Sequence, residues 1–179
     1  MKKVLIIVAL LLVYGSAFAQ PVGYIGLFVD DSHSFWCAEG SGFYSFEMWI
    51  WCLPSERGMI CAEFMCVYPA NVIQSTLTTN PIVSVTLGTL DTGMSVCYFA
   101  CEWDWNWPFH QTLWVTDATE SVITIEKHPD PNIVCIQFAN CEPGYPTECV
   151  SPISMIEINH CTNAVDESSW SAIKGLLNR

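Results

Sequence analysis

Indole side chains dominate the segment with the most potential for chemistry. It runs from Cys101 to His110 and reads Cys-Glu-Trp-Asp-Trp-Asn-Trp-Pro-Phe-His. In an extended strand alternate side chains share a face, so the aromatic residues would lie on one side and the polar residues on the other. The aromatic set is Trp103, Trp105, Trp107 and Phe109, and the polar set is Glu102, Asp104, Asn106 and His110. Exposed indoles beside polar groups can stack on sugar rings or cover the apolar surface of a protein.

We therefore expect a ligand-binding strip made of Trp103, Asp104, Trp105, Asn106, Trp107, Phe109 and His110. The alternative is that the indoles fill the hydrophobic core, since tryptophan is largely buried in most proteins. Pro108 favours a strand end or a sheet edge, because proline cannot donate to the hydrogen-bond ladder. An edge position would leave the strip partly exposed, and the exposure of its indoles decides between the two interpretations.

Carboxylates and histidines suggest two further sites. Glu102 and Asp104 on one strand would have the separation of about 5 to 10 Å that glycosidase carboxylates show, which with a histidine would make a small secreted hydrolase. Asp30, Asp31 and His33 are weak candidates for a metal site, although a polar turn explains them as well. The sequence has no GxSxG or EF-hand pattern and no glycine-rich phosphate loop. We expect a protein that is not an enzyme and that carries no metal or other cofactor.

Residues 1–19 have the pattern of a cleaved signal peptide. Lys2 and Lys3 precede an apolar run over residues 4–14, which is short for a membrane span, and Ala-Phe-Ala before Gln20 is a small-x-small cleavage site. Cleavage would leave four basic residues against 18 acidic ones, a net charge of −14. Such a chain repels phosphates, so we expect no nucleic-acid partner. We predict a secreted protein, extracellular, periplasmic or at the cell surface, with no membrane span after cleavage.

All ten cysteines follow that leader, and an even count in an exported chain is typical of a disulfide framework. Local geometry favours two pairs. Cys52 and Cys61 flank a Pro-Gly turn, and Cys141 and Cys149 flank a loop with two prolines. Cys66 shares strand parity with apolar neighbours and is a candidate for a free buried thiol. The CxxC pairs typical of zinc sites do not occur.

The elements that must position these residues are strands, because the hydrophobic period is close to two. Nine runs separated by turn residues are expected to form strands: 24–28, 42–52, 59–68, 82–87, 94–103, 111–116, 121–126, 133–138 and 153–158. This pattern predicts an all-β protein, an antiparallel β-sandwich over residues 20–164, of the jelly-roll or a similar type. Residues 165–179 have apolar side chains at helical spacing and predict a short amphipathic C-terminal helix or a docking tail.

Residues 46–73 resemble the start of a cohesin-type sandwich. The resemblance rests on a strand that ends at Pro54, a bend at Gly58 and a corner at Tyr68-Pro69-Ala70-Asn71, which lacks the Asp of the Tyr-Asp-Pro-like corner in cohesins. The mature chain also resembles a group of exported bacterial proteins that has no assigned activity. That likeness rests on the opening over 24–30, the Trp-rich centre over 104–107 and the tail over 169–174. Both resemblances imply a fold and a compartment, and neither implies a reaction.

These observations predict a non-catalytic binding or structural module that is secreted or held at the cell envelope. Its partner would be an extracellular protein or a glycan. A carbohydrate-binding module that uses the strip over 103–109 is the first alternative, and the small hydrolase is the second.

Overall fold

The computed structural model describes residues 23–161, and this part of the chain contains thirteen strands. They are β1 (Tyr24–Phe28), β2 (Cys37–Ala38), β3 (Tyr44–Leu53), β4 (Met59–Val67), β5 (Val72–Thr79), β6 (Val83–Thr89), β7 (Gly93–Glu102), β8 (Asn106–Val115), β9 (Ser121–Glu126), β10 (Gln137–Ala139), β11 (Thr147–Cys149), β12 (Ser151–Ser154) and β13 (Ile156–Ile158). No helix occurs between residues 23 and 161, and the described chain has none that could cross a membrane.

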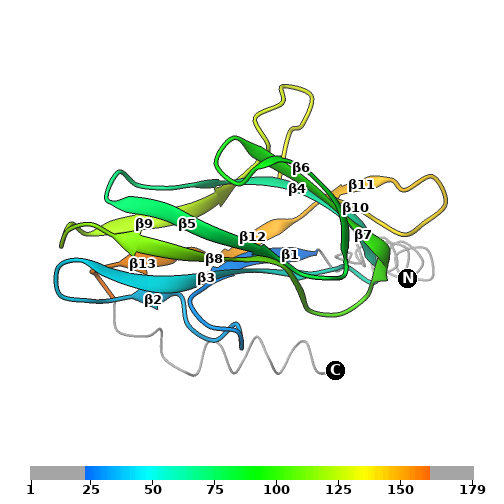
Figure 1. The fold of residues 1–179 in the computed structure, drawn as a ribbon. Helices are drawn as coiled ribbons and strands as arrows, with labels where there is room; N and C mark the ends of the chain where they lie inside the picture. Colours follow the sequence, from blue (N-terminus) through cyan, green and yellow to red (C-terminus); the bar gives the residue numbers. More distant parts are fainter. Residues whose placement is uncertain (1–22, 162–179) are drawn as a thin grey trace, which may run out of the picture.

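The strands form two sheets that face each other as a sandwich (Figure 1). The five-stranded sheet has the order β12-β1-β3-β8-β5. The larger sheet has the order β11-β10-β4-β9-β13-β2, and the β6–β7 hairpin extends it from β4. Pairing is antiparallel except between β1 and β12 and between β13 and β2. The predicted all-β sandwich is confirmed.

Alternation along the strands directs one apolar face of each sheet into a shared core. In β3 and β8 every second side chain is buried over most of the strand. The five-stranded sheet contributes Ile25, Leu27, Met48, Ile50, Phe109 and Leu113, and the larger sheet contributes Phe64, Val96, Ile123, Phe138 and Ile156. The other face of each sheet, its outer face, is therefore free to carry other chemistry.

Several strands departed from the sequence prediction. The short strands β2 and β11 were not predicted, and neither was β5, a sheet edge in which seven of eight residues are exposed, so it has no apolar alternation. The run over 153–158 divides into β12 and β13, which lie in different sheets. The predicted signal peptide and the predicted helix over 165–179 lie outside the described residues.

Four disulfides cross-link the sandwich, and both predicted pairs are wrong. The bonds are Cys37–Cys161, Cys61–Cys97, Cys101–Cys141 and Cys135–Cys149. Cys61 lies directly opposite Cys97 on β7, with 4.0 Å between their Cα atoms. Cys52 points into the core on the other sheet, so it cannot reach Cys61, although the two flank one turn. Cys52 and Cys66 are free and buried, which confirms the prediction for Cys66.

Candidate functional site

The predicted aromatic strip does not form one row, because the chain turns within it. Strand β7 ends at Glu102 and β8 begins at Asn106, so residues 103–105 are a connection between the two sheets. Trp103, Trp105 and Trp107 consequently lie in three different surroundings. The expected common face of the strip is therefore wrong.

A bulge inside β8 separates two further members of the strip. The register between β3 and β8 shifts at the pairs Ile50–Phe109 and Cys52–Asn106. The shift accommodates Pro108 in a central strand, so Pro108 marks a bulge and neither a strand end nor an edge. Phe109 is fully buried in the core, while Trp107 is partly exposed on the outer face with His110.

Six rings from β3, β8 and two adjoining loops lie at the outer face of the five-stranded sheet, in two groups of three whose members contact one another. We call His33, Trp49, Trp51, Trp105, Trp107 and His110 the outer aromatic cluster. In its first half Trp49 stacks on His110, with ring centroids 4.4 Å apart and planes 13° apart. Trp107 meets Trp49 edge to face at 5.0 Å. Because neighbouring strands place Trp49 directly opposite His110, their rings stand beside each other above the sheet.

The second half of the cluster covers the end of β1. His33 stacks on Trp105 with a centroid distance of 4.6 Å and lies 4.8 Å from Trp51. Phe28, which pairs with Trp49 and so belongs to the outer face, is completely buried beneath this group. The connection over 103–105 and the loop after β1 thus place aromatic rings over one end of the sheet.

Polar groups border the cluster. The Glu47 carboxylate lies 3.3 Å from His110 Nδ1 and accepts a hydrogen bond of 2.8 Å from Thr112 Oγ1. The buried indole N–H of Trp51 has no acceptor among the described residues. A surface that combines partly exposed tryptophans with an oriented carboxylate is suited to binding.

Trp103 is the most exposed tryptophan between residues 23 and 161, at 62%, and lies apart from the cluster. Its six-membered ring packs against Gly58 in the turn between β3 and β4. Gly58 has φ 70°, and a Cβ there would lie 3.1 Å from Trp103 ring atoms and 3.0 Å from the sulfur of Cys141. Asp104 is exposed beside it and accepts a hydrogen bond from the Trp105 N–H, while Asn106 is buried and donates to the Asp104 carbonyl.

The weak metal candidates are occupied in other ways. Asp30 accepts hydrogen bonds from the Ser32 hydroxyl and from the backbone N–H groups of Ser34 and Phe35. Burial opposes ionisation of Asp30, but these hydrogen bonds outweigh it and lower the pKa of the carboxyl. His33 is turned into the outer aromatic cluster. Residues 23–161 contain no group of three or more side chains able to hold a metal ion.

The carboxylates of the hydrolase alternative are not arranged as expected. Glu102 is the last residue of β7, and Asp104 lies in the turn, so they do not share a strand face. His110 interacts with Glu47 on the neighbouring strand. The structure therefore does not place Glu102 and Asp104 on one strand face, as that alternative assumed.

Trp49 and Trp51 of β3 were not predicted as members of the site. Glu47, Trp49 and Trp51 alternate with Met48, Ile50 and Cys52, and the pattern itself was visible in the predicted strand over 42–52. Trp49 and Trp51 could not be assigned to the outer face, because they are large apolar side chains like those of the buried set. His33 was noticed only as a metal ligand.

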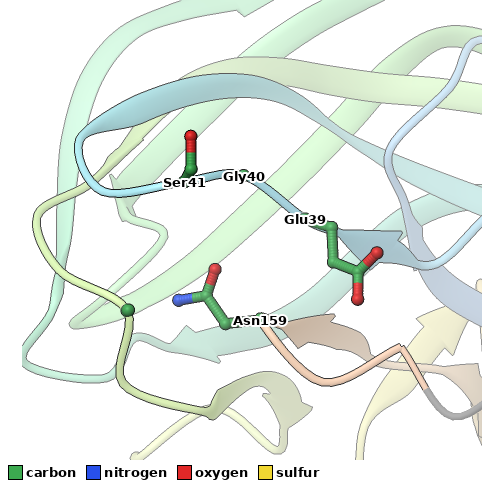
Figure 2. Close-up of a pocket in the computed structure, with 5 residues that line it drawn as sticks. Glu39, Gly40, Ser41 and Asn159 are labelled. Carbon is green, nitrogen blue, oxygen red and sulfur yellow. The ribbon is translucent and has the colours of Figure 1, made fainter.

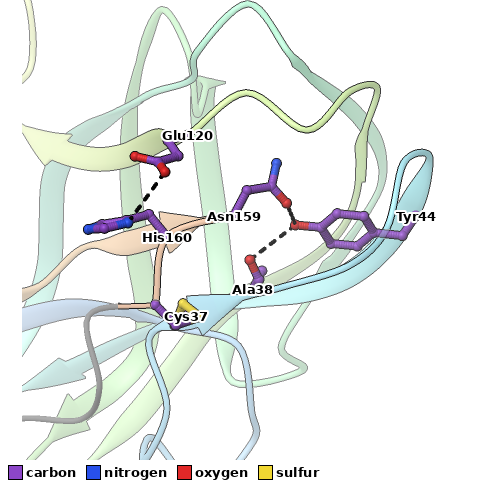
Figure 3. Close-up of a disulfide and its surroundings, with 7 residues drawn as sticks. Cys37, Ala38, Tyr44, Glu120, Asn159 and His160 are labelled. Carbon is purple, nitrogen blue, oxygen red and sulfur yellow. Dashed lines mark hydrogen bonds and ion pairs between the residues drawn. A yellow bond between two sulfur atoms is a disulfide. The ribbon is translucent and has the colours of Figure 1, made fainter.

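A hollow at the far end of the sandwich is a structural junction (Figure 2). It is lined by Glu39, Gly40, Ser41, Ala118 and Asn159. The Asn159 amide donates to the carbonyls of Asp117 and Thr119, and its oxygen lies 2.9 Å from the Tyr44 hydroxyl. Figure 3 shows this junction beside the Cys37–Cys161 disulfide and the Glu120–His160 ion pair. Its polar groups are used to join loops.

Comparison with known proteins gives a fold and no family. No family model matches the chain, and no curated protein matches it. Among solved structures it is similar to a type II cohesin domain from the cellulosome of Acetivibrio cellulolyticus, with a TM-score of 0.54 at 14% identity over 78% of this chain and 96% of that one. A type I cohesin–dockerin complex from Clostridium thermocellum gives 0.54 at 8% identity over 80% and 97% of the two chains.

A non-cellulosomal cohesin from the archaeon Archaeoglobus fulgidus is similar as well, with a TM-score of 0.52 at 9% identity over 84% of this chain and 96% of that one. At these identities the likeness concerns the fold alone. The sandwich is cohesin-like, which confirms that part of the resemblance seen over residues 46–73.

Proposed function

We propose that this protein is a non-catalytic, exported binding module whose ligand is another protein. The observation that carries the proposal is the outer aromatic cluster: four tryptophans and two histidines, partly exposed on the outer face of a sheet. Core packing does not require them there, since the core between the sheets is filled by other side chains. Tryptophan is the residue type most enriched at the energetic centres of protein interfaces.

The ring geometry favours a protein over a sugar. A sugar binds to the free face of an aromatic ring, but Trp49 stacks on His110 and Trp105 stacks on His33. Ring edges and partly exposed indoles suit the side chains of a protein partner. Of the predicted strip, Trp103 is the one residue with a largely exposed ring, so the carbohydrate alternative depends on that residue.

Two further features support the proposal. The similar structures include cohesins in complex with dockerins, which are protein partners. The four disulfides suit an oxidising compartment, in agreement with the predicted signal peptide over 1–19. We extend the proposal to a domain over residues 20–164 that works outside the cytoplasm.

Alanine substitution in the cluster tests the proposed ligand class. The immobilised protein is used to capture secreted proteins from the organism that makes it. We expect Trp107→Ala to weaken a captured interaction by at least tenfold, because a tryptophan at an interface centre contributes about 2 kcal/mol or more. The matched control is Phe99→Ala, an exposed aromatic residue on the outer face of the other sheet.

Two results would count against the proposal. One is a captured protein whose affinity falls with Phe99→Ala and is unchanged by Trp107→Ala. The other is quenching of tryptophan fluorescence by soluble oligosaccharides that Trp103→Ala abolishes, which would favour the carbohydrate alternative.

A further inference from the structure

One long stretch of this acidic chain has no charge. The sequence carries a net charge of −12, yet no Asp, Glu, Lys, Arg or His occurs from Phe64 to Leu90. This stretch includes the whole of β5 and β6. Each is the last strand at its side of the described sheets, because β5 pairs only with β8 and β6 pairs only with β7.

These two edges differ from the other edges of the described sheets. Strands β2, β11 and β12 have two, three and four residues, and β12 contains Pro152. Short length and proline are the usual protections of an edge against pairing with another chain. Strands β5 and β6 have eight and seven residues, with no proline and no charge.

Of these two edge strands, β6 has the more regular pairing over its second half, residues 85–89. Its pairing with β7 runs without a shift from Val85–Cys97 to Thr89–Gly93, whereas β5 is interrupted between Gln74 and Leu77. On its outer face Val85 and Leu87 are 50% and 65% exposed. Two aliphatic side chains therefore stand at an unpaired strand edge.

The edge is held in place by its neighbours. The Cys61–Cys97 disulfide fixes β7 to β4. At the hairpin tip Leu90 is buried, and its carbonyl accepts a hydrogen bond of 2.6 Å from the Cys66 N–H. A strand that is already ordered loses little conformational entropy when another strand pairs with it.

We propose that β6 pairs edge to edge with β6 of a second copy of this chain, antiparallel and centred on Thr86. This arrangement is self-complementary, because it sets Val85 of each copy opposite Leu87 of the other. The distribution of charge along the chain favours a second copy as the partner of β6. Two chains of net charge −12 repel each other, and the neutral stretch over 64–90 lets them approach without like charges in contact. The contact lies on the other sheet from the outer aromatic cluster, so it is independent of the proposed function.

The test is the oligomeric state of the oxidised, full chain, measured by sedimentation equilibrium over a range of concentrations. We expect a dimer, whose dissociation constant rises at least tenfold in Leu87→Lys because two like charges then enter the paired edge. The matched control is Leu77→Lys on the β5 edge, which should leave the dissociation constant within twofold. Hydrogen exchange provides a second readout: amides over 83–89 should become more protected as the concentration rises.

Each alternative result has a definite meaning. A monomer at all concentrations overturns the proposal, and so does a dimer that Leu87→Lys leaves intact. A dimer weakened only by Leu77→Lys would assign the contact to β5. If the protein is monomeric and its β6 amides become protected only when an extended peptide is added, the partner of β6 is a different chain and the proposed dimer is wrong.

Discussion

At the residue scale, the two free thiols have the environment of core side chains. Cys52 and Cys66 are fully buried, and burial raises the pKa of each thiol to about 12. A thiolate is the reactive form, so neither should react with iodoacetamide in the folded protein at pH 8. After unfolding without a reductant, we expect two alkylated cysteines per chain by mass spectrometry.

Peptide mapping provides the control for that prediction. The two modified sites should be Cys52 and Cys66, and the other eight cysteines should react only after reduction. Alkylation in the native state, or a modified Cys61 or Cys149, would contradict the assignment.

The sequence alone could identify a free thiol such as Cys66, but it could not identify the bonding partners of the other cysteines. Cys66 was recognised because its own strand alternates clearly, which is local information. Pairing depends on which strands are neighbours, and Cys61 meets Cys97 only because β4 and β7 pair. The same limit applies to His110, whose partner Glu47 is 63 residues away in the sequence.

At the element scale, the turn between β3 and β4 supports Trp103 through Gly58. The φ of 70° at this position disfavours any side chain, and a Cβ would also press on Trp103 and Cys141. We expect Gly58→Ala to lower the free energy of unfolding by about 1–2 kcal/mol for the backbone and by about 1 kcal/mol or more for the contacts. Urea denaturation measures the total.

Gly42 separates the two contributions. Its φ is 80°, but nothing lies within 4 Å of a Cβ built there. Gly42→Ala should therefore show the backbone cost alone. If both substitutions lower the free energy of unfolding equally, the packing of Trp103 on Gly58 does not contribute to stability.

Elements were predictable where alternation and burial coincide. The runs over 24–28 and 121–126 match β1 and β9 residue for residue. The predicted strand began at residue 111, whereas β8 begins at Asn106. Proline normally ends strand pairing, and the bulge that accommodates Pro108 depends on the pairing of β8 with β3. The exposed edge β5 has no alternation to detect.

At the scale of the whole molecule, the Cys37–Cys161 disulfide closes the longest loop. It joins residues 124 apart, while Cys135–Cys149 spans only 14. If disulfides stabilise by restricting the unfolded chain, replacing both cysteines of the long loop by serine should cost about 2 kcal/mol more than replacing those of the short one. Thermal or urea unfolding of the two double variants gives the difference, and an equal or reversed order would contradict this explanation.

The all-β class and the sandwich followed from the period of the sequence, whereas the proposed binding surface required the arrangement of the strands and loops. The indoles of residues 101–110 were correctly singled out as unusual. Trp105 and Trp107 lie at the outer face, Trp103 in the turn and Phe109 in the core, and this distribution depended on one bulge and one connection. The other three rings of the cluster, Trp49, Trp51 and His33, come from β3 and the loop after β1.

Photo-crosslinking tests the central claim, that the outer aromatic cluster is the surface that binds a protein. p-Benzoylphenylalanine is placed at Trp107 in one variant and at Phe99 in another, so that each aromatic residue is replaced by an aromatic crosslinker. Irradiation with the secreted proteins of the source organism should join one defined protein to the Trp107 variant and none to the Phe99 variant. Crosslinks at Phe99 with none at Trp107 would contradict the assignment of the binding surface.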